Sequence, residues 1–109
     1  IYGRAEPIRI LLHIAKAEYE DVRYELSEWP EIKNDEKFEY GCLPVLEKDG
    51  KHYSQTPAIL RFLGREYGYY PSDADQAYVV DNAFEAVYDF GMGLYIMKDL
   101  KDEEKKEAL

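Results

Sequence analysis

The sequence predicts an α/β domain, with a mixed sheet and helices, followed by the start of an all-α domain. Three observations lead to this prediction. Residues 6–17 have the apolar spacing of a helix, an Asp-Gly turn separates two short strand patterns in residues 43–54, and a long helical pattern begins near residue 74. A unit that alternates helices and strands before a purely helical stretch is typical of an α/β domain joined to a helical one.

The first predicted helix, residues 6–17, begins with Glu6 and Pro7. An acid and a proline both suit the first helical turn, because the acid interacts favourably with the helix dipole and the proline needs no hydrogen-bond acceptor there. The apolar side chains of this helix are Ile8, Ile10, Leu11, Leu12, Ile14 and Ala15. Because they cover much of its circumference, we expect the helix to be buried on two sides.

The following residues alternate between strand formers and polar side chains. Residues 19–26 predict a strand, residues 28–34 a short helix around Trp29-Pro30, and residues 35–40 a polar loop. A second strand is expected in residues 43–47 and a third in residues 51–54, joined by the hairpin turn Asp49-Gly50.

A further helix is expected to begin at Thr56, with Thr56 as its N-cap and Pro57 in the first helical position. It should run to Tyr67 and stop at Gly68. A linker with proline, serine and aspartate then leads to a long helix over residues 74–98, and Asp102 is expected to begin another. The predicted domains are therefore residues 1–70 and residues 71–109.

Charge and composition exclude several classes of function. The 109 residues carry 14 lysines and arginines against 23 acids, a net charge of -9, which argues against nucleic acid and against anionic membrane surfaces. The single cysteine, Cys42, excludes an internal disulfide and favours a reducing, cytoplasmic location. The two histidines, His13 and His52, lie too far apart for a metal-ligand motif, and no metal is expected.

Both ends of the sequence suggest a piece of a longer protein. The sequence begins at Ile1 without an initiator Met, and it stops within a charged stretch that favours a helix. In addition, the first helix has no strand before it, so a parallel crossover would lack its opening strand. We expect a first strand and most of a helical domain to be missing.

Five motifs in order resemble the glutathione-binding domain of glutathione transferases. They are Gly3-Arg4-Ala5-Glu6-Pro7-Ile8-Arg9, Tyr19-Glu20-Asp21, Trp29-Pro30-Glu31, Leu43-Pro44-Val45-Leu46 and Ser54-Gln55-Thr56-Pro57-Ala58-Ile59. The resemblance is greatest to the sigma class, which includes glutathione-dependent prostaglandin D synthases. It implies a thioredoxin-like domain followed by a helical domain, usually in a homodimer, with glutathione as co-substrate and an electrophilic small molecule as partner.

The resemblance assigns the γ-glutamyl end of glutathione to one short segment. Gln55 and Thr56 would hold the γ-glutamyl carboxylate, through backbone N–H groups at a helix start and the Thr56 hydroxyl. Pro44 would be the cis-proline of thioredoxin-like folds, and Leu43 would pair its backbone with the cysteinyl part. Without the resemblance, Thr56 is a plain N-cap and Pro44 an ordinary edge-strand proline.

The remaining implied contacts come from other parts of the chain. By resemblance, Trp29 and Lys33 reach the glycine carboxylate, Arg4 supports the thiol site, and Asp89 crosses the dimer to the γ-glutamyl ammonium of the partner's ligand. The alternatives are a partly buried anchor for Trp29 and solvated surface charges for the other three.

The sequence departs from the family pattern at several positions. The family's catalytic Tyr falls five residues before Gly3, ahead of Ile1, and Tyr2 is not assigned that role, so no catalytic residue is assigned in this chain. Cys42 replaces a long polar residue that helps to hold glutathione. Tyr88 stands where sigma relatives often carry an acid.

The expected function is that of a glutathione transferase, which conjugates the glutathione thiolate to electrophiles. The alternatives are a glutathione-dependent prostaglandin isomerase and a non-catalytic, crystallin-like member of the family. A Tyr five residues before Gly3 would favour an enzyme, and another residue there would favour a structural role.

Overall fold

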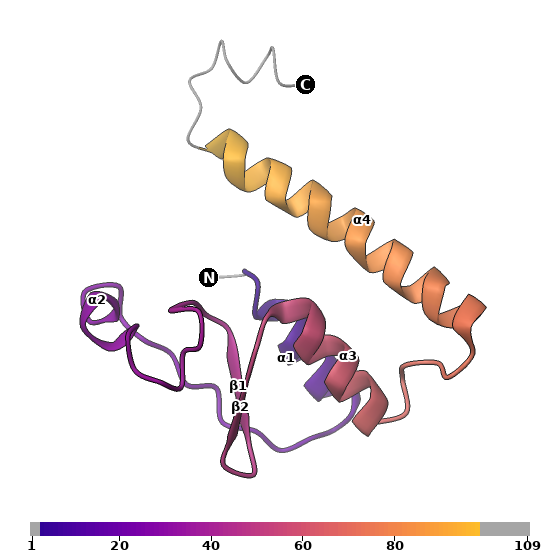
Figure 1. Cartoon of the computed structure of the whole chain (residues 1–109), viewed down its shortest axis with the longest axis horizontal. Coiled ribbons are helices and arrows are strands. Elements are labelled where there is room, and N and C mark those ends of the chain that lie inside the picture. Colours follow the sequence, from indigo (N-terminus) through magenta and orange to yellow (C-terminus); the bar gives the residue numbers. More distant parts are fainter. Residues whose placement is uncertain (1–2, 99–109) are drawn as a thin grey trace. The chain divides into compact units, whose positions relative to one another are not determined.

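The computed structural model describes residues 3–98 and divides the chain into two compact units, Ile1–Tyr70 and Pro71–Leu109 (Figure 1). The first unit contains α1 (Glu6–Ile14), α2 (Trp29–Ile32), β1 (Val45–Lys48), β2 (Lys51–Ser54) and α3 (Thr56–Glu66). The second contains α4 (Ala74–Lys98). The expected α/β unit followed by a helix is confirmed, and the helix expected at Asp102 lies outside the described residues.

The sheet of the described chain is the hairpin of β1 and β2. The two strands pair antiparallel, from Val45 opposite Ser54 to Lys48 opposite Lys51. Asp49 and Gly50 form the turn with φ angles of 52° and 74°. Two positive φ angles in a row are typical of the tight hairpin turn that Asp-Gly predicts, so this prediction is confirmed.

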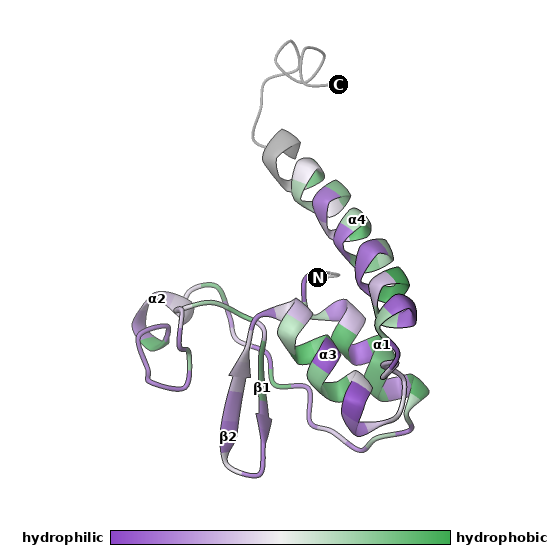
Figure 2. Ribbon diagram, turned by 45° about the vertical axis from the view of Figure 1, so that its right-hand side comes forward, coloured by the Kyte–Doolittle hydropathy of each residue, from purple (hydrophilic) through white to green (hydrophobic). Residues whose placement is uncertain are grey.

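The core of the first unit lies between α1 and α3, which run side by side in Figures 1 and 2 and contact each other. Ile8 and Leu12 of α1 pack against Ile59 and Leu63 of α3 in one buried cluster. Each pair is spaced four residues apart, so each helix presents one apolar stripe to the other.

The hairpin covers α3 through aromatic stacking and an ion pair. The rings of Tyr53 and Phe62 stack with centroids 4.4 Å apart. The Lys48 ammonium lies 2.6 Å from a carboxylate oxygen of Glu66 and 5.7 Å from the centroid of the Phe62 ring. These contacts fix the hairpin against α3, and thereby fix where its open end lies.

The first helix is shorter and less covered than expected. It ends at Ile14, because Lys16 adopts a φ of 53° and the N–H of Ala17 bonds to the carbonyl of Leu12. This is a Schellman ending, which cannot continue as a helix. Ile10 and Ile14 are 52% and 56% exposed, so within the described chain the helix is buried on one face and not on two.

The strand expected in residues 19–26 is not formed. A strand is defined by hydrogen bonds to a neighbouring strand, and the described sheet contains only β1 and β2. An ion pair joins the segment to α1, since Asp21 accepts a hydrogen bond from Arg9 at 3.1 Å. Within the segment, Asp21 also accepts one from Arg23 at 2.9 Å. For the same reason the described sheet is antiparallel and not mixed.

In the second unit, α4 begins with a side-chain cap. The carboxylate of Asp73 accepts the N–H of Gln76 at 2.9 Å, and its carbonyl accepts the N–H of Ala77. A capping aspartate satisfies one of the free N–H groups of the first turn. The long helix predicted from residue 74 is confirmed, and none of the described helices is long and apolar enough to cross a bilayer.

Candidate functional site

Two predicted site segments lie opposite each other at the open end of the hairpin. Val45 is paired with Ser54 at the end of the ladder, so Pro44 and Gln55 are the residues that directly adjoin this last pair. Leu43-Pro44 therefore enters β1 beside the point where Gln55-Thr56 leaves β2. Segments separated by about ten residues in the chain are thus brought together by the Asp49-Gly50 turn.

The peptide bond between Leu43 and Pro44 is cis. The resemblance predicted a cis-proline at this position, and the geometry confirms it. Leu43 is exposed, so this corner of the hairpin is open to solvent.

The start of α3 has a backbone suited to an anion. The first hydrogen bond of this helix runs from the N–H of Ile59 to the carbonyl of Gln55 at 2.9 Å. The N–H groups of Thr56 and Ala58 come before this bond, so the helix offers them no carbonyl acceptor. Pro57 has no N–H. N–H groups at a helix start, together with the helix dipole, attract a carboxylate.

Gln55 makes the transition from strand to helix. It is the N-cap of α3, with φ 71° and ψ 113°, and no side-chain cap bond is formed. A positive φ is costly for a residue with a Cβ and is common at ligand-binding sites. It turns the chain sharply after β2, so that Thr56 begins α3.

The expectation that Thr56 is the N-cap is wrong. Thr56 is the first residue of α3, it is only 5% exposed, and its hydroxyl donates a hydrogen bond to the backbone carbonyl of Arg4 at 3.1 Å. The sequence did not show this because the bond joins residues 52 positions apart. The side chain of Thr56 thus ties the start of α3 to the turn before α1.

Arg4 lies in that turn, where the N–H of Glu6 bonds to the carbonyl of Gly3 at 3.0 Å. Its side chain is exposed. The backbone of Arg4 is therefore next to the start of α3, and three predicted site residues, Arg4, Gln55 and Thr56, are neighbours.

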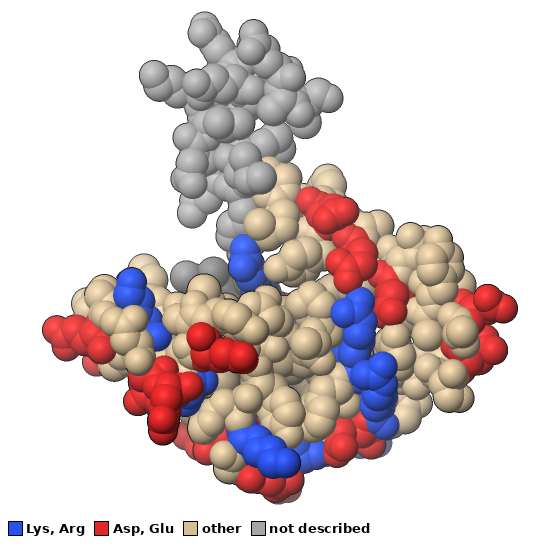
Figure 3. All heavy atoms as spheres, viewed as in Figure 1, with Lys and Arg blue, Asp and Glu red and all other residues tan. Residues whose placement is uncertain are grey.

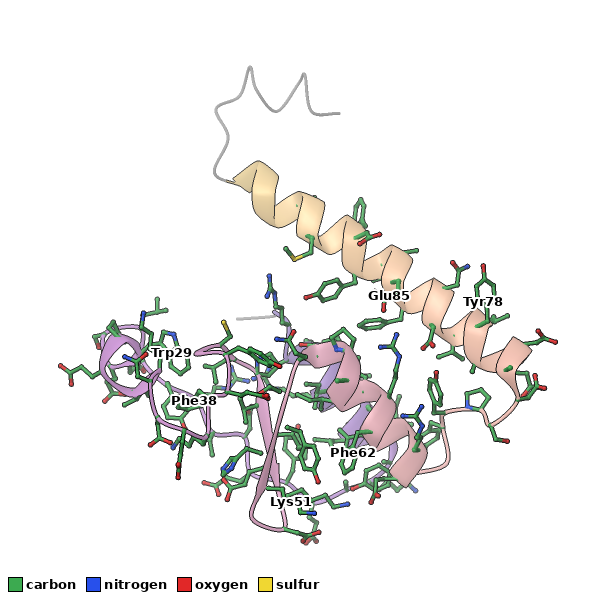
Figure 4. The ribbon with its side chains drawn as sticks, in the orientation of Figure 1. Trp29, Phe38, Lys51, Phe62, Tyr78 and Glu85 are labelled. Atoms are coloured by element: carbon green, nitrogen blue, oxygen red, sulfur yellow. The ribbon has the colours of Figure 1, made fainter. Side chains whose placement is uncertain are left out.

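Trp29 is fixed by an aromatic cluster. Its ring lies 5.0 Å from the ring of Phe38 and 6.1 Å from that of Tyr24, measured between centroids. Figure 4 shows Trp29 and Phe38 together beside α2. Phe38 is buried, although its segment was expected to be a polar loop. Because Trp29 packs against this buried ring, it anchors α2 to residues 35–40. Phe38 is the one apolar aromatic residue within residues 35–40, and it was the feature of the sequence that indicated this cluster.

Trp29 and Leu43 line one open pocket of about 180 Å³. The other residues around it are Tyr24, Glu25 and Leu26. The pocket joins the α2 region to the cis-proline corner, so two of the predicted site residues are brought together here. The sequence analysis did not assign Tyr24 to the site.

Lys33 and Cys42 lie at the edge of this region. Lys33 is the C-cap of α2, its N–H bonds to the carbonyl of Trp29 at 3.0 Å, and its side chain is exposed. Cys42 is a free, exposed cysteine directly before Leu43.

Asp89 lies in α4, in the second unit, and is exposed. Its assignment to the ligand of a partner subunit stays a prediction. Tyr88, beside it in sequence, has its ring 5.9 Å from that of Phe84.

The described part of the chain carries several surface ion pairs, among them those of Asp21 with Arg9 and Arg23 and that of Lys48 with Glu66. Acidic and basic side chains are interspersed on the face shown in Figure 3. Hydrogen bonds from Arg23 and Arg9 hold the pKa of Asp21 below its ordinary value, and the hydrogen bond to Glu66 raises the pKa of Lys48. In residues 3–98, no group of three or more His, Cys, Asp or Glu side chains is arranged to hold a metal ion.

A family model matches residues 1–65, and its description is "Glutathione S-transferase, N-terminal domain". "Glutathione S-transferase 2" of Manduca sexta is 37% identical over 97% of this chain and 51% of its own length. "S-crystallin SL11" of Nototodarus sloanii is 34% identical over 98% of this chain and 52% of its own length. The chain spans about half the length of the curated relatives it matches.

A solved structure supports the same fold. Prostaglandin synthase D of Nilaparvata lugens matches with a TM-score of 0.83 and 35% sequence identity, over 99% of this chain and 54% of that one. The hairpin, the two packed helices and the long helix therefore occur together in a protein of known structure.

Proposed function

The chain belongs to the glutathione S-transferase family, and on that premise we propose that it forms the glutathione site of an enzyme that transfers glutathione to electrophiles. The observation that supports this most directly is the open end of the hairpin. There Leu43-Pro44 leads into β1, whose first residue, Val45, pairs with Ser54 shortly before α3 begins, and the N–H groups at that helix start suit an anion.

The site offers groups that fit the γ-glutamyl and cysteinyl parts of glutathione. The N–H groups of Thr56 and Ala58 can donate to the γ-glutamyl carboxylate, where the dipole of α3 adds to the attraction. The backbone of Leu43, next to the cis bond, can pair with the cysteinyl peptide. These groups come from adjacent segments, as one extended tripeptide requires.

The glycine end would lie toward α2. There Lys33 supplies a positive charge, and Trp29 has a ring held in place by Phe38. A charged hydrogen bond to the glycine carboxylate would be stronger than a neutral one. The short side chain of Cys42 cannot reach as far as the polar residue usual in the family. The glycine end is therefore held by fewer groups.

The chemistry supplied by glutathione is a sulfur nucleophile, which is reactive as the thiolate. In this chain Arg4 can favour the thiolate through its positive charge. The thiolate sulfur bonds to the electrophilic carbon, the leaving group departs with the bonding electrons, and the thiol proton goes to solvent. No residue of this chain is assigned as the hydroxyl donor to the thiolate.

The full-length protein tests this proposal. We expect it to be retained on immobilised glutathione and to conjugate glutathione to a chloronitrobenzene, with release of chloride. Elution by free glutathione is the control for specific binding. A folded protein that passes through the resin without retention would contradict the proposal.

A glutathione-dependent isomerase of the prostaglandin type is a second candidate, favoured by the likeness to prostaglandin synthase D. Both reactions need the same thiolate, so the glutathione site does not separate them. Turnover of a prostaglandin endoperoxide without net consumption of glutathione would favour the isomerase. Binding of glutathione without turnover of any substrate would favour a non-catalytic role such as that of a crystallin.

We also propose that the protein works as a cytoplasmic homodimer, in which Asp89 contacts the γ-glutamyl ammonium of the partner's ligand. The single cysteine agrees with a reducing compartment. Sedimentation of the full-length protein at twice the mass of one chain would support the dimer.

A further inference from the structure

Three tyrosines lie at the end of the first compact unit. Tyr67 and Tyr69 are 39% and 50% exposed, and Tyr70 is the last residue of that unit. Boundaries between compact units usually fall in exposed segments, which are also the preferred sites of proteolysis. Exposed tyrosines at such a boundary would ordinarily be open to proteases that cut after aromatic residues.

The backbone of this segment is nevertheless tied to α3. The chain turns at Gly68, whose φ is 77°. The N–H groups of Tyr69 and Tyr70 then both bond to the carbonyl of Gly64 in the last turn but one of α3, at 2.7 and 3.0 Å. Residues 67–70 therefore form a strap that lies back against the end of the helix.

Gly64 allows the strap to lie this close. It is buried, and a Cβ added to it would meet the Cβ of Tyr70 at 3.1 Å and the backbone nitrogen of Tyr70 at 3.6 Å. The first distance is shorter than an ordinary van der Waals contact, so any larger residue would push Tyr70 away. The Arg65 guanidinium lies 4.7 Å from the centroid of the Tyr70 ring, within the range of a cation–π interaction.

Little chain remains between the strap and the second unit. Asp73 caps α4, so Pro71 and Ser72 are the two residues between Tyr70 and this cap. Proline fixes its own φ at about −65° and also restricts the residue before it. The connection therefore starts from a point held on α3 and is short and partly rigid.

We propose that residues 67–70 are a strap that protects the connection between the two units from proteolysis, and that Gly64 keeps this strap closed. A protease binds its substrate as an extended segment, so the hydrogen bonds of Tyr69 and Tyr70 must break before cleavage. When opening and closing are faster than cleavage, the cleavage rate follows the population of the open strap. The strap lies at the opposite end of α3 from the proposed glutathione site and is independent of it.

The experiment compares the full-length wild type with Gly64→Val, whose side chain takes the place of Tyr70. Gly93→Val is the matched control, because Gly93 lies in α4 and a Cβ added to it would meet no neighbouring group within 4 Å in the described chain. Chymotrypsin, which cuts after tyrosine, is applied well below the melting temperature of each variant, and mass spectrometry identifies the sites. Hydrogen exchange reports the opening of the Tyr69 and Tyr70 amides.

We expect Gly64→Val to be cut within residues 67–70 about tenfold faster than the wild type, because the displaced strap is open more often. The amides of Tyr69 and Tyr70 should exchange faster by a similar factor, and the affinity for glutathione should not change. Gly93→Val should match the wild type in all three measurements. If Gly64→Val does not fold, Tyr70→Ala replaces it and should speed the exchange of the Tyr69 amide.

Three results would overturn the inference. The first is rapid cleavage of the folded wild type within residues 67–70. The second is cleavage and amide exchange at wild-type rates in Gly64→Val, which would show that the contact with Gly64 does not keep the strap closed. The third is equally fast cleavage in Gly93→Val, which would assign the effect to a general loss of stability.

Discussion

Trp29 belongs both to an aromatic cluster and to the lining of a pocket. Its ring packs against Phe38 and Tyr24, and the same residue lines the pocket beside Leu43. A substitution of Trp29 would therefore disturb both packing and binding. Lys33 is a cleaner probe of the glycine end, because its side chain is exposed and its replacement leaves the aromatic cluster in place.

We predict that Lys33→Ala weakens glutathione binding about threefold to tenfold, because it removes one charge-assisted and partly screened contact. The binding of γ-glutamylcysteine, which lacks the glycine, should not change. Calorimetric titration with both ligands checks this, and Lys51→Ala at the hairpin turn is a matched exposed control. Equal weakening for the two ligands would exclude a contact with the glycine carboxylate.

Asp21 gives a residue-scale prediction about pH. Its pKa lies below the ordinary value because Arg23 and Arg9 donate hydrogen bonds to its carboxylate. A carboxyl group with a lowered pKa stabilises the fold above its unfolded pKa of about 4, and this contribution is lost as the pH falls through the folded value.

Arg23→Gln should raise the pKa of Asp21 toward its ordinary value, because the partner with the most hydrogen bonds to it is lost. A titration of the Asp21 carboxyl carbon by NMR measures this shift. In Asp21→Asn, the part of the acid sensitivity that depends on this carboxyl should disappear. An unchanged pKa of Asp21 in Arg23→Gln would show that Arg9 is sufficient alone.

At the scale of elements, α1 and α3 end in the same way with different residues. In α1 the left-handed position is occupied by Lys16, with a φ of 53°, and in α3 by Gly68, with a φ of 77°. In both helices the next N–H bonds back to a carbonyl of the last turn, from Ala17 to Leu12 and from Tyr69 to Gly64. Glycine takes this conformation without the clash that a Cβ causes.

This comparison predicts opposite effects for two substitutions. Lys16→Gly should raise the free energy of unfolding by roughly 0.5–1 kcal/mol, and Gly68→Ala should lower it by about 1 kcal/mol. Denaturant unfolding of the full-length protein checks both. Lys16→Ala, which removes the charge and keeps the Cβ, should give no such gain. A gain equal to that of glycine would assign the effect to charge.

At the scale of the whole molecule, the described chain has a small core and much exposed apolar surface. One buried cluster joins α1 and α3, while Ile14 of α1 and Val87 and Phe90 of α4 are more than half exposed. An apolar side chain that stays exposed forgoes roughly 1.5–3 kcal/mol of burial. The free energy of unfolding of a protein is only about 5–15 kcal/mol in total. A few exposed apolar side chains therefore forgo an amount of burial energy comparable with the whole stability.

We therefore predict that the 109-residue polypeptide, expressed alone, self-associates or unfolds without a cooperative transition, and shows no transferase activity. The full-length protein should melt cooperatively and be active. Sedimentation velocity and a thermal melt compare the two. A monomeric, cooperative and active short polypeptide would contradict this, and Tyr2 would then be the first residue to test as the hydroxyl donor.

The sequence alone determined the local features of this protein. The Asp49-Gly50 turn, the stop at Gly68 and the helices around the apolar stripes follow from conformational preferences of neighbouring residues. The cis-proline at Pro44 was implied by the resemblance to the family, and the structure confirms it.

Only the tertiary structure decided the features that depend on residues distant in sequence. The strand expected in residues 19–26 is absent because a strand needs a neighbouring strand to which it can form hydrogen bonds. The burial of Phe38 depends on the rings of Trp29 and Tyr24. Thr56 lies one position inside α3 and bonds to Arg4, across 52 positions of the chain. A hydroxyl donates to whichever acceptor the folded chain places within reach, and local sequence carries no information about that acceptor.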